Sequence, residues 1–240
     1  MHLTTLSRTP PILLAVLLSA CSTGTNPIMQ TMQYIVKPGG SVTGVNLNPD
    51  FRFMRVVVDG RVVFLALGNE DKDASGTIEV WYSAEREVLR FQNGRLVGAV
   101  GLSTEWRSVA LPALPSWVAL SRAENPIRWT RIRDVMPGYR YGVQDALVLR
   151  RTVAPGKSEI QGVDSGTLTW FEEQADVRAS LRDTNSVLDK TLPLARYAVD
   201  LRDGKEIVVY GEQCMAPDLC FSWQRWPAAA NRSSESQAAR

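Results

Sequence analysis

Cysteines, a histidine and carboxylates are the side chains of this sequence that could do chemistry. The chain of 240 residues has 3 cysteines, 1 histidine and 25 Asp and Glu residues. A glycosidase needs two carboxylates held at a fixed distance across a groove. Glu172 and Glu173 are neighbours in a predicted strand, where adjacent side chains point to opposite faces. Glu70, Asp71 and Asp73 lie in a predicted solvated loop. Neither group predicts a catalytic pair.

The residues before Cys21 predict export and attachment of lipid. The apolar run over residues 12–18 is too short to span a bilayer, and Ser19 and Ala20 place small side chains before the cysteine. Residues 18–21 resemble the lipobox of bacterial lipoproteins, in which the signal is cut before the cysteine and the thiol carries a diacylglycerol. Ser22 is not an aspartate, which by resemblance to enterobacterial lipoproteins favours the outer membrane. The alternative is an ordinary cleaved signal with an incidental cysteine.

Cleavage before Cys21 would also remove His2, the single histidine of the chain. Without histidine, Ser-His-Asp and Cys-His nucleophile systems and histidine-containing metal sites are excluded. The same cut removes Arg8 and no acidic residue, so the remaining chain is close to neutral and gives no sign of nucleic-acid binding. We expect no enzymatic activity, cofactor or metal. We expect acyl chains to hold the protein at the outer membrane, facing the periplasm.

Cys214 and Cys220 are the two cysteines that remain once Cys21 is lipidated. In an oxidising periplasm, two cysteines close together in sequence usually pair. Pro217 lies between them and allows the chain to turn back, so the favoured interpretation is a disulfide that links a late hairpin. Its small loop limits the stabilisation to about 2 kcal/mol in the chain-entropy model. A redox-active pair and a metal site are the alternatives, although the spacing is not Cys-x-x-Cys.

The 7 tryptophans raise the question of carbohydrate binding. A flat indole face complements the apolar face of a pyranose ring, and Arg128 and Arg131 flank Trp129 in a way that could hold an acidic sugar. The alternative, which we favour, is that the tryptophans fill the core while the stems of arginine side chains cover them. Trp129, Arg128 and Arg131 stand as the candidate carbohydrate contacts.

Polar and apolar residues alternate through most of the chain after residue 50, which predicts antiparallel strands. Asp59-Gly60, Asn93-Gly94 and Asp203-Gly204 separate β-branched runs, a pattern typical of type I′ hairpins. About ten short strands without alternating long helices predict an all-β fold. A large antiparallel meander that curls into a barrel or half-barrel is the expected architecture.

Four segments make up the predicted organisation. They are a lipoprotein signal peptide over 1–20, a lipidated tether with a short helix over 21–50, a single antiparallel β domain over 51–226 and a disordered tail over 227–240. The helix is expected over residues 26–36, where Asn26 can cap it and Pro27 can take the first helical position. Residues 107–126 are expected to be irregular because prolines interrupt their pattern.

These elements, taken in order, resemble the YjbF-type lipoproteins, also called group 4 capsule polysaccharide lipoproteins. The matching segments are 18–21, 53–68, 81–84, 93–102 and 202–210. The resemblance covers most of the chain after the signal. The resemblance implies an exported lipoprotein without known enzymatic activity, whose gene lies with genes for exopolysaccharide or capsule production. It supplies no catalytic residues.

The favoured hypothesis is therefore a non-enzymatic outer-membrane lipoprotein that assists the production, assembly or export of an exopolysaccharide or capsule. Its partners would be the membrane, through the acyl chains on Cys21, and either the polysaccharide or the export proteins. Two alternatives stay open. One is a periplasmic carbohydrate-modifying enzyme, and the other is a structural envelope lipoprotein unrelated to polysaccharide.

Overall fold

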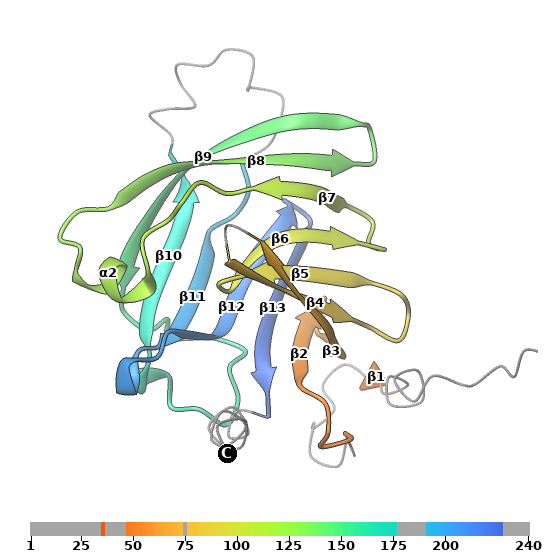
Figure 1. Ribbon diagram of the computed structural model, residues 1–240, viewed down its shortest axis with the longest axis horizontal. Coiled ribbons are helices and arrows are strands. Elements are labelled where there is room, and N and C mark those ends of the chain that lie inside the picture. Colours follow the sequence, from red (N-terminus) through yellow and green to blue (C-terminus); the bar gives the residue numbers. More distant parts are fainter. Residues whose placement is uncertain (1–34, 37–46, 74–75, 177–190, 228–240) are drawn as a thin grey trace, which may run out of the picture.

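The computed structural model describes residues 47–73, 76–176 and 191–227, together with the two-residue strand β1 (Ile35–Val36). Strands β2 to β13 form an antiparallel meander that closes into a twelve-stranded barrel (Figure 1). Each of these strands pairs with the next one in sequence, and β13 pairs with β2 to close the barrel. The all-β meander expected from the sequence is confirmed, and it is a closed barrel.

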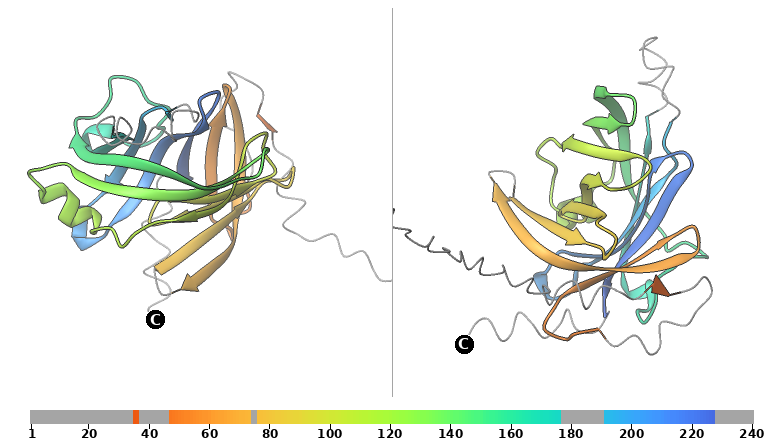
Figure 2. Two further views of the ribbon diagram at one scale, coloured as in Figure 1. Left: turned by 90° about the horizontal axis from the view of Figure 1, so that it is seen from above. Right: turned by 90° about the vertical axis from the view of Figure 1, so that its right-hand side faces the viewer.

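The strands differ in length, and the longest ones follow the first turn and the β8–β9 turn. Their bounds are β2 Phe53–Val58, β3 Arg61–Asp73, β4 Gly76–Tyr82, β5 Val88–Gln92, β6 Arg95–Val100, β7 Glu105–Ala110, β8 Ile127–Met136, β9 Arg140–Thr152, β10 Thr169–Ala175, β11 Ala195–Asp200, β12 Ile207–Ala216 and β13 Leu219–Trp226. Figure 2 shows the strands wrapping around a common interior, with the long β3–β4 hairpin projecting from it.

Two of the predicted hairpin turns, Asp59-Gly60 and Asn93-Gly94, join their strands directly, whereas Asp203-Gly204 lies in the longer connection between Asp200 and Ile207. All three have the backbone that their sequences require. In Asp59-Gly60, Asn93-Gly94 and Asp203-Gly204, both residues have positive φ, between 49° and 77°. A type I′ turn needs positive φ at both central positions, and Asx-Gly reaches this conformation with little strain. Gly94 also has to be glycine because a Cβ there would lie 2.4 Å from the Val208 side chain.

Aromatic side chains fill much of the interior of the barrel. Trp81, Trp106 and Trp223 are each 1% exposed. The ring centroids of Phe91 and Trp223 are 4.8 Å apart, at a tilt that aromatic pairs favour. Along β8, for example, inward positions alternate with outward ones, as expected for a sheet whose inner face is buried. This alternation decides which of the functional candidates point inward.

One short α-helix, α2 (Trp117–Arg122), covers one end of the barrel. Ser116 caps it by accepting a hydrogen bond from the Ala119 N–H at 3.2 Å. Trp117 enters the interior, where its indole N–H donates to the Asn93 carbonyl at 3.1 Å. Its backbone N–H donates to Glu206 Oε2 at 2.7 Å, which connects the helix to the segment between β11 and β12.

Three expectations about local structure are corrected. The helix expected over residues 26–36 is wrong at its described end, because Ile35 and Val36 pair as a strand with Val63 and Val62. β-Branched residues suit this pairing, and the edge of β3 is open there because β4 begins to pair only at Ala66. The remainder of that helix, the signal peptide and most of the tether and tail lie outside the described residues.

The other two corrections concern segments that were expected to be irregular. The polar stretch with Glu70, Asp71 and Asp73 is not a loop, because β3 continues through it and pairs with β4. Within residues 107–126, the structure has the end of β7 and all of α2. A six-residue helix between prolines is too short to show a helical period in the sequence.

A long segment after β9 packs against the outside of the barrel. Leu168 and Trp170 form a buried cluster there with Ala198 and Tyr210, and Ile160 packs against it. Gln161 fixes the segment to β13, because its N–H donates to Gln224 Oε1 at 2.9 Å and its carbonyl accepts from Gln224 Nε2 at 2.6 Å. This outer layer forms one wall of the cavity described below.

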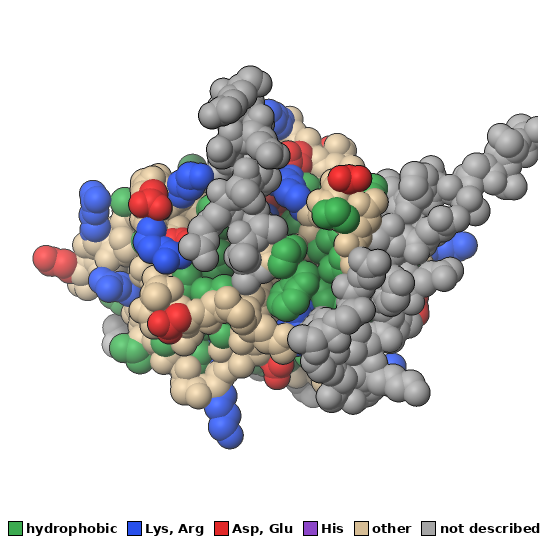
Figure 3. Space-filling model, turned by 90° about the horizontal axis from the view of Figure 1, so that it is seen from below, with side chains coloured by type: hydrophobic (Ala, Val, Ile, Leu, Met, Phe, Trp, Pro, Cys, Tyr) green, Lys and Arg blue, Asp and Glu red, His purple; other side chains and the backbone are tan. Residues whose placement is uncertain are grey.

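Charged side chains of both signs lie on the face of the described residues that Figure 3 shows. On the face drawn in Figure 3, basic and acidic side chains are intermixed around the edge and hydrophobic side chains gather toward the middle. Among the described residues, no helix has the length and apolar character needed to cross a membrane.

Candidate functional site

A cavity of about 400 Å³ lies on the outside of the barrel, between the strands and the segment that follows β9. A volume in this range is typical of small-molecule sites. The β2–β3 turn contributes Asp59 and Gly60, and the segment after β9 contributes residues 157–159. The floor comes from β12 and β13, including both cysteines of the late hairpin. Strands far apart in sequence therefore meet here because β13 closes the barrel against β2.

Tyr210 joins two walls of this cavity through hydrogen bonds. Its hydroxyl donates to Glu212 Oε1 at 2.7 Å and accepts from the Glu159 N–H at 3.0 Å. Burial, followed by the hydrogen bond to Glu212, raises the pKa of Tyr210 above its ordinary value. Tyr210 thus stays a neutral hydrogen-bonding group that fixes the position of the segment after β9.

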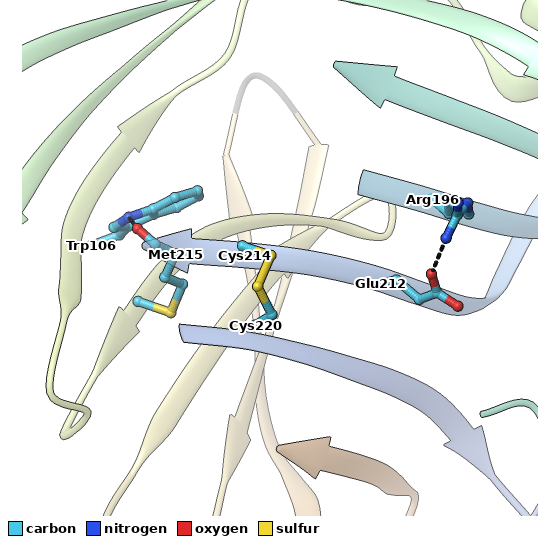
Figure 4. The surroundings of a disulfide bond; sticks show 6 residues. All are labelled: Trp106, Arg196, Glu212, Cys214, Met215 and Cys220. Carbon is cyan, nitrogen blue, oxygen red and sulfur yellow. Dashed lines mark hydrogen bonds and ion pairs between the residues drawn. A yellow bond between two sulfur atoms is a disulfide. The ribbon is translucent and has the colours of Figure 1, made fainter. Parts of the chain in front are cut away.

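Glu212 is the carboxylate that lies deepest among the charged lining residues. Its Oε2 pairs with Arg196 Nη1 at 2.8 Å, an ion pair across β11 and β12 that Figure 4 shows beside the cysteines. Its side chain is 22% exposed, so it can still meet a ligand. On β13, the Ser222 hydroxyl is buried at the cavity, beside the Tyr210 hydroxyl.

Cys214 and Cys220 form a disulfide at one side of the cavity (Figure 4). They lie directly opposite each other on β12 and β13, and their Cα atoms are 3.9 Å apart. The next residue, Met215, points inward, where its carbonyl accepts a hydrogen bond from the Trp106 indole at 3.1 Å. The disulfide favoured by the sequence is present, and it links the strand that carries Glu212 to the strand that carries Ser222.

Removing this disulfide should destabilise the protein moderately. For a double variant with Cys214→Ser and Cys220→Ser, we expect the free energy of unfolding to fall by about 2 kcal/mol, because the closed loop is short. Urea unfolding of the oxidised protein and the variant would measure the difference. Wild-type protein reduced before unfolding is the matched control and should resemble the variant. Equal stability of the oxidised protein and the variant would show that the bond adds nothing to the paired hairpin.

A second cluster of polar groups lies inside the barrel. Asp145 accepts from Arg131 Nε at 2.9 Å, from Arg133 Nε at 2.7 Å and from Arg133 Nη2 at 2.9 Å. The two guanidinium groups also lie over the Trp106 ring, at 4.6 and 5.1 Å from its centroid. Burial alone would raise the Asp145 pKa, but the two arginines outweigh it and hold that pKa below its usual range.

The interior cluster continues across the barrel to Glu173 and Arg95. Glu173 is 3% exposed and lies 3.9 Å from Arg131 Nη1. Burial raises the Glu173 pKa, and Arg131 and Arg95 only partly oppose this effect. Arg95 stacks on the Trp117 ring at 4.0 Å, while its Nε and Nη2 lack a hydrogen-bond partner among the described residues. These groups are closed off from solvent, so they act on the stability of the barrel and not on a dissolved substrate.

The three candidate carbohydrate contacts do not share a surface. Trp129 and Arg131 point into the barrel and are 8% and 7% exposed. Arg128 points outward, where its Nε pairs with Asp176 Oδ2 at 3.0 Å. Period-two alternation along β8 separates these side chains. The other tryptophans of the chain also lie in the interior or in outer packing clusters.

The carboxylates considered for catalysis are separated in the same way. Glu172 faces outward and pairs with Arg150, whereas Glu173 faces the interior. Among the residues that the structure describes, no group of three His, Cys, Asp or Glu side chains is arranged to hold a metal ion. Cys21 lies outside the described residues.

The sequence did not point to the outer cavity or to the buried charges. A signal for the charges exists, because Arg131 and Arg133 have the same strand parity as Trp129 and Val135 and so share the inward face. The cavity has no comparable signal, since it depends on where the segment after β9 folds back.

Comparison with known proteins gives a family and a fold. The family model described as group 4 capsule polysaccharide lipoprotein gfcB, YjbF, matches residues 45–221. Among solved structures, the chain is similar to the hypothetical lipoprotein YmcC from Escherichia coli K12, with a TM-score of 0.51 and 16% sequence identity. That match covers 75% of this chain and 85% of the YmcC chain. At this identity the likeness supports a shared fold. No curated protein matches the chain.

Proposed function

The chain belongs to the YjbF family of group 4 capsule polysaccharide lipoproteins, and we propose that it is a non-enzymatic accessory factor in the production, assembly or export of an exopolysaccharide. The observation that carries the proposal is the family match over residues 45–221, which spans most of the closed barrel. Membership of a lipoprotein family implies a membrane lipid anchor. We propose Cys21 as the lipidated residue and the periplasmic face of the outer membrane as the location.

The arrangement of the described residues supports a binding role over catalysis. The buried charges are inaccessible, and Glu212, the half-buried carboxylate of the outer cavity, is engaged by Tyr210 and Arg196 within the fold. A closed barrel that carries an outer cavity suits contact with the polymer or with export proteins. The anchor would keep this cavity within reach of material that moves through the periplasm.

Loss of the anchor should release the protein from the membrane and reduce polysaccharide output. Acyl chains contribute roughly 0.8 kcal/mol per buried methylene, so two or three chains give stable attachment without help from protein surface. In the test variant, a cleavable secretory signal without a lipobox replaces residues 1–21. We expect this variant in the soluble periplasmic fraction and the wild-type protein in outer-membrane fractions after density-gradient separation.

A deletion strain tests the accessory role itself. Under inducing conditions it should release less extracellular polysaccharide per cell than the parent, and the wild-type gene should restore the amount. The anchor-free variant should restore it only partly. Normal polysaccharide from the deletion strain would refute the accessory role, and an anchor-free variant that still sediments with membranes would refute the proposed attachment.

A further inference from the structure

We propose that the outer cavity binds one neutral, hydroxyl-rich sugar residue of the polymer. This inference deepens the proposed function and rests on it for the identity of the ligand. The cavity has about 400 Å³ of space, which exceeds the size of a single sugar ring and lies in the range of small-molecule sites. It opens at the surface beside the exposed residues Asp59, Lys157 and Glu159, so a residue within a longer chain can enter it.

Hydrogen-bonding groups lie side by side on the floor of the cavity, where Ser222 on β13 pairs with Glu212 on β12. The Ser222 hydroxyl is buried and lies beside the Tyr210 hydroxyl. A hydroxyl can donate one hydrogen bond and accept others, so this contact leaves capacity for a further partner at the cavity. Glu212 adds carboxylate lone pairs beyond those that Arg196 and Tyr210 occupy. Sugar hydroxyls can both donate and accept, which matches this set.

Apolar groups lie next to these polar ones. Val57 pairs with Ser222 across β2 and β13, and Leu194 and the Cys214–Cys220 disulfide also line the cavity. A sugar ring presents C–H groups on its faces and hydroxyls at its edge. A lining in which apolar and polar groups are neighbours therefore fits such a ring better than it fits a uniformly polar ligand.

The charges at the cavity favour a neutral ligand over an acidic one. Arg55 donates from Nη1 to the Glu159 carbonyl at 3.1 Å, and Arg196 is already paired with Glu212. Of the described groups that line the cavity or bond to its lining, basic and acidic side chains balance one for one. They are Arg55, Lys157 and Arg196 against Asp59, Glu159 and Glu212. An acidic sugar would meet the exposed carboxylates without a cationic surplus to compensate.

The affinity for an isolated oligosaccharide should be weak. Tyr210 is fully buried and cannot stack on a ring, so recognition depends on hydrogen bonds and the few apolar groups of the lining. We expect dissociation constants in the millimolar range. Such sites become effective when an anchored protein meets a polymer with many repeats, because each repeat offers another binding event.

The test places a large side chain at the rim of the cavity and compares ligand binding with that of a matched control variant. Ser158 lines the cavity on the segment after β9, and Ser108 is an exposed serine on β7 outside the lining. The probes are oligosaccharides released by partial hydrolysis of the strain's own extracellular polysaccharide, divided into neutral and acidic pools by anion exchange. Binding is followed through NMR shifts of backbone amides in the wild-type protein and in the Ser158→Trp and Ser108→Trp variants.

We expect the neutral pool to shift amides around residues 157–159 and 220–222, and we expect Ser158→Trp to weaken this binding at least tenfold while Ser108→Trp leaves it unchanged. Thermal unfolding of both variants at the wild-type temperature would show that each is folded. The inference is overturned if the neutral pool causes no shifts there, if Ser158→Trp binds as well as wild type, or if the acidic pool binds the cavity equally well.

Failure of this inference and failure of the proposed function give different results. Suppose the deletion strain lacks normal polysaccharide output and Ser158→Trp restores it fully without any binding of the neutral pool. The accessory role then stands and the sugar site is wrong. If the deletion strain is normal, the accessory role is wrong, whatever the NMR shifts show.

Discussion

Replacing Asp145 with asparagine should lower the free energy of unfolding by about 3–5 kcal/mol, because it removes the negative charge that two buried guanidinium groups share. Arg131 and Arg133 both bond to this carboxylate, and both are nearly inaccessible, with 9% and 3% of their side-chain surfaces exposed. Asparagine keeps the shape and one acceptor oxygen but removes the charge. Urea unfolding at neutral pH measures the loss.

The pH dependence of the stability difference between the wild-type protein and Asp145→Asn identifies the electrostatic origin of that difference. The folded protein holds the Asp145 pKa below its usual value, so the carboxylate stabilises the fold above the unfolded pKa. That stabilisation is lost as pH falls through the folded pKa, where the carboxylate is protonated. The gap between the wild-type protein and Asp145→Asn should therefore narrow as pH is lowered from 7 toward 3.

Glu70→Gln supplies the matched control for Asp145→Asn. Glu70 forms an ion pair with Arg52, but both side chains are more than 40% exposed. Solvent screens such a pair, so the change should cost no more than about 1 kcal/mol. Similar losses for the two variants, or a gap for Asp145→Asn that is independent of pH, would contradict the role assigned to the buried cluster.

The sequence predicted the architecture because turn chemistry and alternation are local signals. Asx-Gly pairs at three hairpins require positive φ at both positions, and the structure has it at all three. Alternation along β8 likewise places Trp129 and Arg131 on one face and Arg128 on the other. Closure of β13 onto β2 follows from no local signal, since it joins the two ends of the barrel.

The elements that were not predicted from the sequence lack a recognisable pattern of buried and exposed positions. The distal half of β3 carries Glu70 and Asp71 because this hairpin projects from the barrel and does not bury one face, so the usual alternation is absent. Helix α2 is too short to show a periodic pattern. The outer cavity was missed for a different reason, because it depends on Gln161 meeting Gln224 over a separation of 63 residues.

Replacing Trp117 with alanine should destabilise the protein by about 3–5 kcal/mol, the range for truncating a large buried aromatic side chain. The indole packs at 4.9 Å from the Phe171 ring and 5.4 Å from the Tyr197 ring, and the Arg95 guanidinium lies over it at 4.0 Å. Its removal also breaks the hydrogen bond to Asn93. The loss would leave a cavity beside a buried cation, so this site cannot collapse easily.

We expect Trp117→Ala to loosen first the end of the barrel where α2 lies, and only then the whole fold. Val118, the next residue of α2, is only half-buried, and Val118→Ala should cost no more than about 1 kcal/mol. Amide hydrogen exchange should accelerate across residues 111–126 in Trp117→Ala and stay near wild type in Val118→Ala, because the helix is held chiefly through the indole. An equal loss of stability in both variants would contradict this prediction, because the indole would then contribute no more than the Val118 side chain. A large loss of stability in Trp117→Ala alone would support the interpretation that α2 closes this end of the barrel and shields Arg95 from water.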